Sequence, residues 1–153
     1  MPTSYIYLKL TADSVHILQR LVIDAADETE VCGVLVGVCN GPRVWSVTNV
    51  HPLSNMSLRK DSFAIDVQEF CRKRDLLERE GFTILALYHS HTDGSTRPSI
   101  RDLELPRLTS LPSVILAHGD QGLAMECYGE PALETIPVLV TPLRCGTRLS
   151  GVK

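Results

Sequence analysis

The stretch Thr83-Ile-Leu-Ala-Leu-Tyr-His-Ser-His91 begins as an uncharged apolar run and ends in two histidines. Such a run, without turn-forming residues, predicts a strand over 83–88 that is buried on both faces of a sheet. Side chains alternate along an extended segment, so His89 and His91 point to the same face and can converge on one metal ion. The pair alone leaves another interpretation open, in which one histidine belongs to the core and the other to a solvated loop.

A carboxylate is expected close to these two histidines. Asp102 lies eleven residues after His91, in the first turn of a helix predicted over about 99–108, so a short loop can return it to the strand end. Two imidazoles and one carboxylate leave a fourth tetrahedral position for water, as in catalytic zinc sites. However, Ser99-Ile-Arg-Asp102 also matches a capping box at the start of the helix. The residues by themselves leave the ligand and capping roles open.

Hairpins and helices alternate through the rest of the chain, which predicts an α+β fold with a mixed sheet and helices packed on it. Further strands are predicted over 5–10, 31–38, 43–51, 63–66, 114–117, 123–128 and 134–140. Further helices are predicted after the cap candidates at 11–14 and over 67–80. No repeat or linker interrupts this order, so we expect one domain over residues 1–141 and a tail over 142–153.

Length and composition restrict the class of protein. The 153 residues suffice for one domain but hardly for two, and a net charge of -3 offers no field to hold a polyanion, so we expect no nucleic-acid partner. Five cysteines without a CxxC pair argue against a disulfide framework and a thiolate zinc site, and favour a reducing compartment. No apolar run approaches the roughly 20 residues that cross a bilayer, and no signal-peptide pattern opens the chain. We therefore expect a cytoplasmic protein without a membrane partner, and the choice between monomer and homodimer stays open.

Two motifs in this chain resemble those of one family. His89-Ser90-His91, seven further residues and Ser99-Ile-Arg-Asp102 resemble, without a spacing departure, the HxH-x7-S-x2-D signature of the JAMM (MPN+, JAB) zinc metalloproteases. Upstream, Glu30-Val-Cys-Gly-Val-Leu-Val-Gly37 is similar to the Glu-x-Cys-Gly-x-Leu-x-Gly stretch of many small prokaryotic members. The similarity follows the order of elements over most of residues 5–128. It implies the cytidine-deaminase-like α/β sandwich, with a mixed, mostly antiparallel sheet flanked by helices.

The resemblance also implies a chemistry. His89, His91 and Asp102 would bind one zinc ion per chain, which activates the attacking water. Glu30 would act as general base and then as general acid, and the Ser99 hydroxyl could donate to the oxyanion. Small prokaryotic relatives act on the C-terminal tails of ubiquitin-like proteins. The implied function is therefore a zinc isopeptidase or peptidase that cuts after the Gly-Gly of a ubiquitin-like or sulfur-carrier protein.

Several alternatives remain beside this interpretation. The whole domain could be a catalytically silent scaffold of the same fold, or a general zinc peptidase. Zinc deamination is excluded, because its H-x-E and P-C-x-x-C patterns are absent.

The roles of single residues also have alternatives. Glu28 is an alternative to Glu30, and Cys32 is expected to pack within its apolar run instead of acting as a nucleophile. In the resemblance to the JAMM family, Thr92 replaces the proline that more commonly follows the second histidine. Phe63 is expected to pack in the core or at an edge of the sheet.

Overall fold

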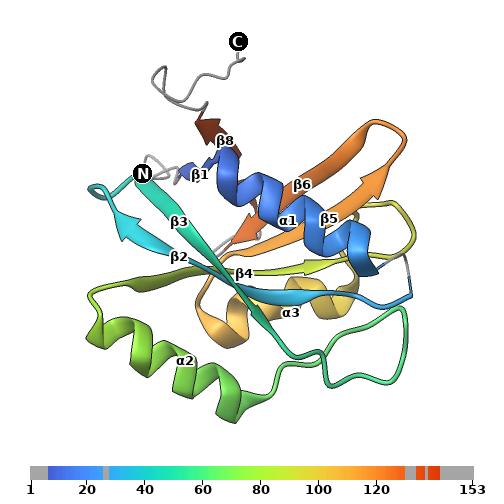
Figure 1. Cartoon of the computed structure of the whole chain (residues 1–153), viewed down its shortest axis with the longest axis horizontal. Coiled ribbons are helices and arrows are strands. Elements are labelled where there is room, and N and C mark those ends of the chain that lie inside the picture. The colour runs from blue at the N-terminus through green and yellow to red at the C-terminus, as the bar shows by residue number, and fades with distance from the viewer. Residues whose placement is uncertain (1–6, 26–27, 130–133, 137, 142–153) are drawn as a thin grey trace.

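The computed structural model describes residues 7–25, 28–129, 134–136 and 138–141 of the chain. Within these residues the chain forms three helices and eight strands (Figure 1). Their order is β1 (Tyr7–Thr11), α1 (Ala12–Ala25), β2 (Cys32–Cys39), β3 (Val44–Leu53), α2 (Val67–Arg79), β4 (Thr83–Ser90), α3 (Ile100–Thr109), β5 (Ser113–Gly119), β6 (Gly122–Gly129), β7 (Glu134–Ile136) and β8 (Val138–Thr141). The predicted tail over 142–153 lies outside the described residues, so the domain boundary at 141 stays a prediction.

The strands form one mixed sheet with the order β7-β6-β5-β4-β2-β3-β1-β8. Four of its seven neighbouring pairs are antiparallel, and β1–β3, β1–β8 and β4–β5 are parallel. Helix α1 covers one face, while α2 and α3 lie on the other (Figure 1). This confirms the predicted sandwich of a mixed, mostly antiparallel sheet between helices. None of the helices among the described residues is long and apolar enough to cross a membrane.

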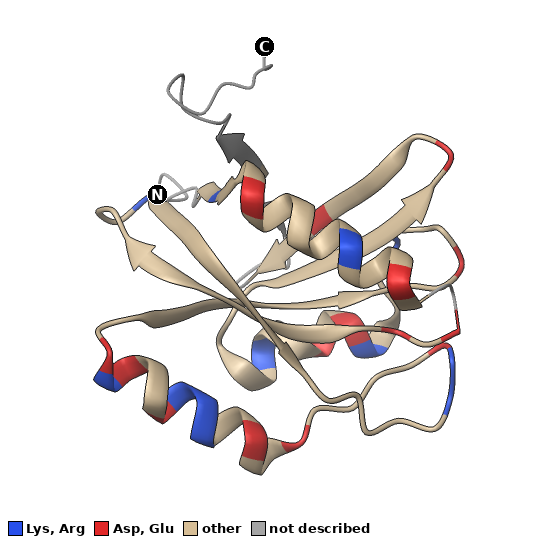
Figure 2. Ribbon diagram, viewed as in Figure 1, with Lys and Arg blue, Asp and Glu red and all other residues tan. Residues whose placement is uncertain are grey.

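Strands β2 and β4 lie in the middle of the sheet and carry no Lys, Arg, Asp or Glu, whereas most charged residues lie on the helices and loops (Figure 2). One core cluster packs beneath α1 and contains Leu18, Leu35 and Tyr88. The second packs beneath α2 and α3 and contains Val34, Leu77 and Leu87, with Leu105 against it. Apolar side chains therefore alternate between the two cores along the central strands, as expected of strands buried on both faces.

Two predicted strands differ from the structure. Residues 63–66 form only an isolated bridge between Ile65 and Asn55. The reason is local, because the Ala64 N–H donates to the Asn55 side chain at 3.0 Å and does not extend a strand ladder. The strand predicted over 134–140 is two strands, and β7 pairs with β6 while β8 pairs with β1 at the opposite edge of the sheet. Pro137 separates them in the sequence, and proline cannot donate to a ladder.

Gly33 on β2 leaves room for the Tyr88 side chain of the neighbouring strand β4. A Cβ added at this glycine would lie 2.6 Å from the Tyr88 hydroxyl and would also clash with the carbonyl oxygen of His51. The Tyr88 side chain is fully buried, so it has no room to move aside. Only glycine fits this position without displacing either neighbouring strand.

We expect Gly33→Ala to lower the free energy of unfolding by about 1–3 kcal/mol, because overpacking forces rotamers or backbone to shift. Gly119→Ala is the matched control, since nothing lies within 4 Å of a Cβ added there. Urea unfolding followed by circular dichroism measures both. Equal stability of the two variants would contradict the close approach at Gly33.

Candidate metal centre and catalytic cleft

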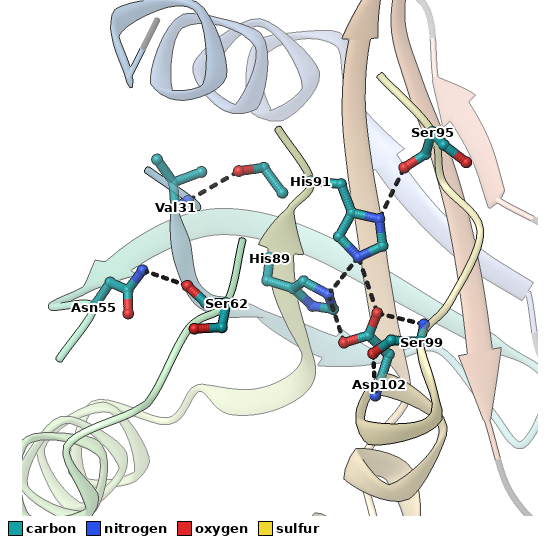
Figure 3. A network of polar contacts seen from close by, with 9 residues as sticks. Val31, Asn55, Ser62, His89, His91, Ser95, Ser99 and Asp102 are labelled. Carbon is teal, nitrogen blue, oxygen red and sulfur yellow. Dashed lines mark hydrogen bonds and ion pairs between the residues drawn. The ribbon is translucent and has the colours of Figure 1, made fainter. Parts of the chain in front are cut away.

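His89, His91 and Asp102 come together where β4 ends and α3 begins (Figure 3). Their potential ligand atoms all lie within 4.8 Å of one another. Asp102 Oδ1 is 3.2 Å from His89 Nε2, and Asp102 Oδ2 is 2.9 Å from His91 Nε2. The two Nε2 atoms are 3.3 Å apart. The structure thus brings together the three residues that the sequence motif proposed as ligands.

The start of α3 directs Asp102 toward the histidines. Ser99 is the N-cap of this helix, and its Oγ accepts a hydrogen bond from the Asp102 N–H at 3.1 Å. In return, the Ser99 N–H donates to Asp102 Oδ2 at 2.9 Å. The capping box that the sequence left open is therefore present. The same carboxylate also faces both histidines, so the capping and ligand arrangements coexist.

The hydrogen bonds around the cluster fit a metal ion. His91 Nδ1 lies 2.8 Å from the carbonyl oxygen of Ser95, and a carbonyl can only accept, so Nδ1 carries the proton. The Nε2 atom of His91 faces His89 and Asp102, and it offers a lone pair there when it carries no proton. Metal-binding histidines commonly donate their other ring N–H to a carbonyl in this manner. Two imidazole nitrogens and one carboxylate oxygen form a donor set that suits zinc.

Burial and pairing set the charges of the three residues. Burial lowers the pKa of His89 against the opposing hydrogen bond to Asp102, which favours the neutral ring that a metal requires. The hydrogen bond to Asp102 raises the pKa of His91. Burial opposes ionisation of Asp102, but hydrogen bonds from the two histidines outweigh it and hold the pKa of that carboxyl well below its usual range. The cluster therefore presents a carboxylate whose negative charge a cation can neutralise.

Glu30 lies beside this cluster, just before β2. The antiparallel register pairs Cys32 with His89, and the Ser90 N–H donates to the carbonyl oxygen of Val31 at 2.9 Å. Continuing this pairing brings Glu30 alongside His91. Only 5% of Glu30 is exposed, and burial raises its pKa to about 7 although His91 opposes the shift.

Glu28, the alternative carboxylate, is exposed to solvent. The structure therefore favours Glu30 over Glu28 as the acidic residue of the site. Their spacing to the Cys32-Gly33 pair was the only sequence signal that separated them.

A cleft of about 1380 Å³ opens onto the cluster between α2, α3 and the loops 54–66 and 92–98. Residues from each of these segments line it, and the lining also includes Glu30 and His91; its members include Phe63, Ser99, Asp102 and Leu105. The predicted base, the oxyanion donor and two of the predicted ligands, His91 and Asp102, thus face one space that a substrate can enter, while His89 is fully buried behind them. His118, which follows another strand end, is half-buried on β5 and is not among the described residues that line this cleft.

The family model for prokaryotic homologs of the JAB domain matches residues 15–128. The chain belongs to this family. Among solved structures, a JAB1/MPN domain protein from Archaeoglobus fulgidus aligns over 87% of this chain and 98% of its own, with a TM-score of 0.60 and 19% identity. A protein from Desulfitobacterium hafniense aligns over 89% of this chain and 94% of its own, with a TM-score of 0.75 and 22% identity. These similarities show that the JAB domain shares their fold.

Two proteins with assigned activities are similar to this JAB domain in sequence. A probable TtuB-protein conjugate cleaving protease from Thermus thermophilus is 36% identical over 78 residues, which cover 51% of this chain and 49% of the relative. A desampylase from Haloferax volcanii is 33% identical over 76 residues, which cover 49% of this chain and 52% of the relative. The chain thus spans about half the length of the curated relatives it matches.

The sequence did not reveal two neighbours of the JAB-domain histidines. The Phe63 ring stacks on the His89 ring with a centroid distance of 4.3 Å and an interplanar angle of 22°. Phe63 was expected to pack as an ordinary core or edge residue, and its packing partner proved to be a candidate ligand. Ser95 orients His91 through its main-chain carbonyl, so the identity of its side chain gave no signal.

Cys32 is buried at the start of β2, as expected for a packing residue. Its Sγ lies 3.7 Å from the carbonyl oxygen of Leu53, and burial raises the pKa of the thiol to about 12. Since the thiolate is the reactive form of cysteine, Cys32 is unsuited to nucleophilic catalysis at neutral pH.

We expect Cys32 to resist iodoacetamide in the folded protein at pH 7.5, because its thiol is both buried and protonated. Cys39, at the other end of the same strand, is exposed and should be alkylated, which makes it the internal control. Peptide mass mapping after timed alkylation measures both sites. Modification of Cys32 at the rate of Cys39 would show that the thiol is accessible and reactive.

Proposed function

We propose that this JAB domain is a zinc-dependent hydrolase that cleaves the amide or isopeptide bond after the C-terminal Gly-Gly of a ubiquitin-like or sulfur-carrier protein. The observation that carries the proposal is the convergence of His89, His91 and Asp102 beside the buried Glu30, at an open cleft that His91, Asp102 and Glu30 line. The relatives named as a TtuB-conjugate cleaving protease and a desampylase support this class of substrate. We place the activity in the cytoplasm and assign it to a domain over residues 1–141.

His89, His91 and Asp102 would hold one zinc ion per chain. Bound there, zinc would supply Lewis-acid chemistry that activates water and polarises the scissile carbonyl. The protein's part is to keep both Nε2 lone pairs and the carboxylate directed at one point. The carbonyl of Ser95 does this for His91, and the capping box of α3 does it for Asp102.

Glu30 is the general base and then the general acid in this proposal. It accepts a proton from the attacking water and passes it to the amine that leaves. A pKa raised to about 7 by burial suits both steps, because the group can bind and release a proton near neutral pH. The Ser99 hydroxyl accepts the Asp102 N–H through its oxygen and still has its own proton to donate to the developing oxyanion.

Mutation of any proposed ligand should empty the metal site of a protein that remains folded. His91→Ala or Asp102→Ala leaves two donors, which form an incomplete zinc set, whereas neither residue is a member of a core cluster. Zinc per chain, measured by elemental analysis, should fall from about one to near zero. His118→Ala is the matched control and should keep its zinc. Full occupancy in the ligand variants would refute the assignment.

Glu30→Gln should keep its zinc yet lose about 10²–10⁴-fold in turnover, because it removes proton transfer without removing a metal ligand. Turnover is measured on a ubiquitin-like fusion, with metal analysis of the same sample. Glu28→Gln, an exposed carboxylate two residues away, should behave like the wild type. Loss of zinc in Glu30→Gln would instead make this residue a ligand.

A narrow Gly-Gly tail should be the preferred substrate, because it has no side chains to obstruct the cleft and a folded partner adds affinity outside it. The test offers ubiquitin-like and sulfur-carrier proteins with C-terminal extensions or lysine adducts, beside unrelated unfolded proteins, and reads products by intact mass. Cleavage just after Gly-Gly, abolished by a chelator and restored by zinc, supports the proposal. Equal cleavage of the unrelated chains would indicate a general zinc peptidase, and no cleavage at all would favour the silent scaffold.

A further inference from the structure

The side chain of Asn55 uses every hydrogen-bonding position that an amide possesses. Its Nδ2 donates to the carbonyl oxygen of Glu30 at 2.8 Å and to that of Ser62 at 3.2 Å. Its Oδ1 accepts from the N–H groups of Ser57 at 2.9 Å and Ala64 at 3.0 Å. An amide offers two donor hydrogens and two lone pairs, so no capacity remains. This single side chain therefore joins Glu30 to both ends of the loop 57–64.

The loop 57–64 belongs to the site. Its residues form part of the wall of the cleft, and its Phe63 stacks on His89. Within the loop, the hydroxyls of Ser57 and Ser62 are 2.5 Å apart, which closes it on itself. Thr92, directly after the second histidine, donates its hydroxyl to the carbonyl of Lys60 at 3.4 Å. The position of this loop thus affects both the cleft and a candidate ligand.

The main chain at Glu30 is held from the other side by β4. The Val31 N–H donates to Ser90 Oγ at 2.9 Å, and the Ser90 N–H donates back to the Val31 carbonyl at 2.9 Å. Ser90 lies between the two histidines in the sequence. Within the part of the chain that the structure describes, the Glu30 carboxylate has no hydrogen-bond partner. Its direction therefore depends on how Asn55 and Ser90 fix its main chain.

We propose that Asn55 is a positioning residue that fixes the base Glu30 and the cleft loop 57–64 in one frame. The inference rests on the proposed function, in which Glu30 moves the proton. Asn55 touches no reacting atom and acts only through Glu30 and the loop. A displacement of about 1 Å in a catalytic group can cost on the order of 10²-fold in rate, so loss of the bonds that join Glu30 to the loop should lower turnover.

Asn55→Asp removes the hydrogen bonds to the carbonyls of Glu30 and Ser62 together. The aspartate keeps the shape of the side chain and both acceptor bonds, but it loses the two bonds that Nδ2 donates. Asn49→Asp is the matched control, because Asn49 is exposed on β3 and its side chain accepts a hydrogen bond from the neighbouring Thr48. Asn55→Ala, which adds no charge, is the second variant. Zinc content and thermal unfolding are followed for all three.

We expect Asn55→Asp to keep about one zinc per chain and to lose on the order of 10–10²-fold in kcat on the ubiquitin-like fusion, with a smaller change in KM. In a Glu30→Gln background the same substitution should cost little, because the group it positions is already disabled. Asn49→Asp should change neither. An equal loss in both backgrounds, or no loss, would overturn the positioning role.

Hydrogen exchange supplies a readout that needs no turnover. In Asn55→Ala, amide exchange should accelerate in the peptides that cover residues 28–32 and 56–64 together, and in neither for Asn49→Ala. Acceleration in only one segment, or in none, would show that Asn55 does not couple them. Failure of the proposed function is recognised separately, because zinc-loaded wild type would not cleave the fusion, or Glu30→Gln would cleave it as fast.

Discussion

The carboxylate of Asp102 is the group on which the rest of the site depends. Through the capping box with Ser99 it fixes the first turn of α3, and through its two oxygens it faces both histidines. A capped first turn holds its N3 side chain in one direction, and here that direction leads to the end of β4. The same carboxylate thus caps the helix and forms part of the candidate metal centre. The hydrogen bonds it accepts from the two histidines keep its pKa low.

The central position of β4 explains why the site is buried and yet reachable. Its strand neighbours are β2 and β5, so it has no free edge, and functional groups can face solvent only where the chain leaves the sheet. His89 is fully buried at this point, while the cleft opens above His91 and Asp102. Glu30 reaches the same place because β2 runs antiparallel to β4. Burial raises the pKa of Glu30. The apolar packing of the strands in the cores offsets the free energy that burying this carboxyl group costs.

The cores do not need the metal. Both clusters consist of apolar side chains from the sheet and the helices, and the candidate ligands lie at their margin. A chain of this length buries enough surface to fold without a metal staple. Zinc therefore has a chemical role in the proposed function, and the fold serves to hold the proposed ligands, the base and the cleft loop 57–64 in place.

The sequence by itself determined the central strands, the common face of His89 and His91, and the place of Asp102 in the first turn of a helix. Each depends on periodicity within one element, which the order of residues fixes directly. Only the tertiary structure decided that Glu30 is buried and Glu28 exposed, that Phe63 stacks on His89, and that residues 134–140 divide between opposite edges of the sheet. These outcomes depend on which distant segments pair and pack, and that choice is made by the free energy of the whole sheet and its cores, which no local pattern contains.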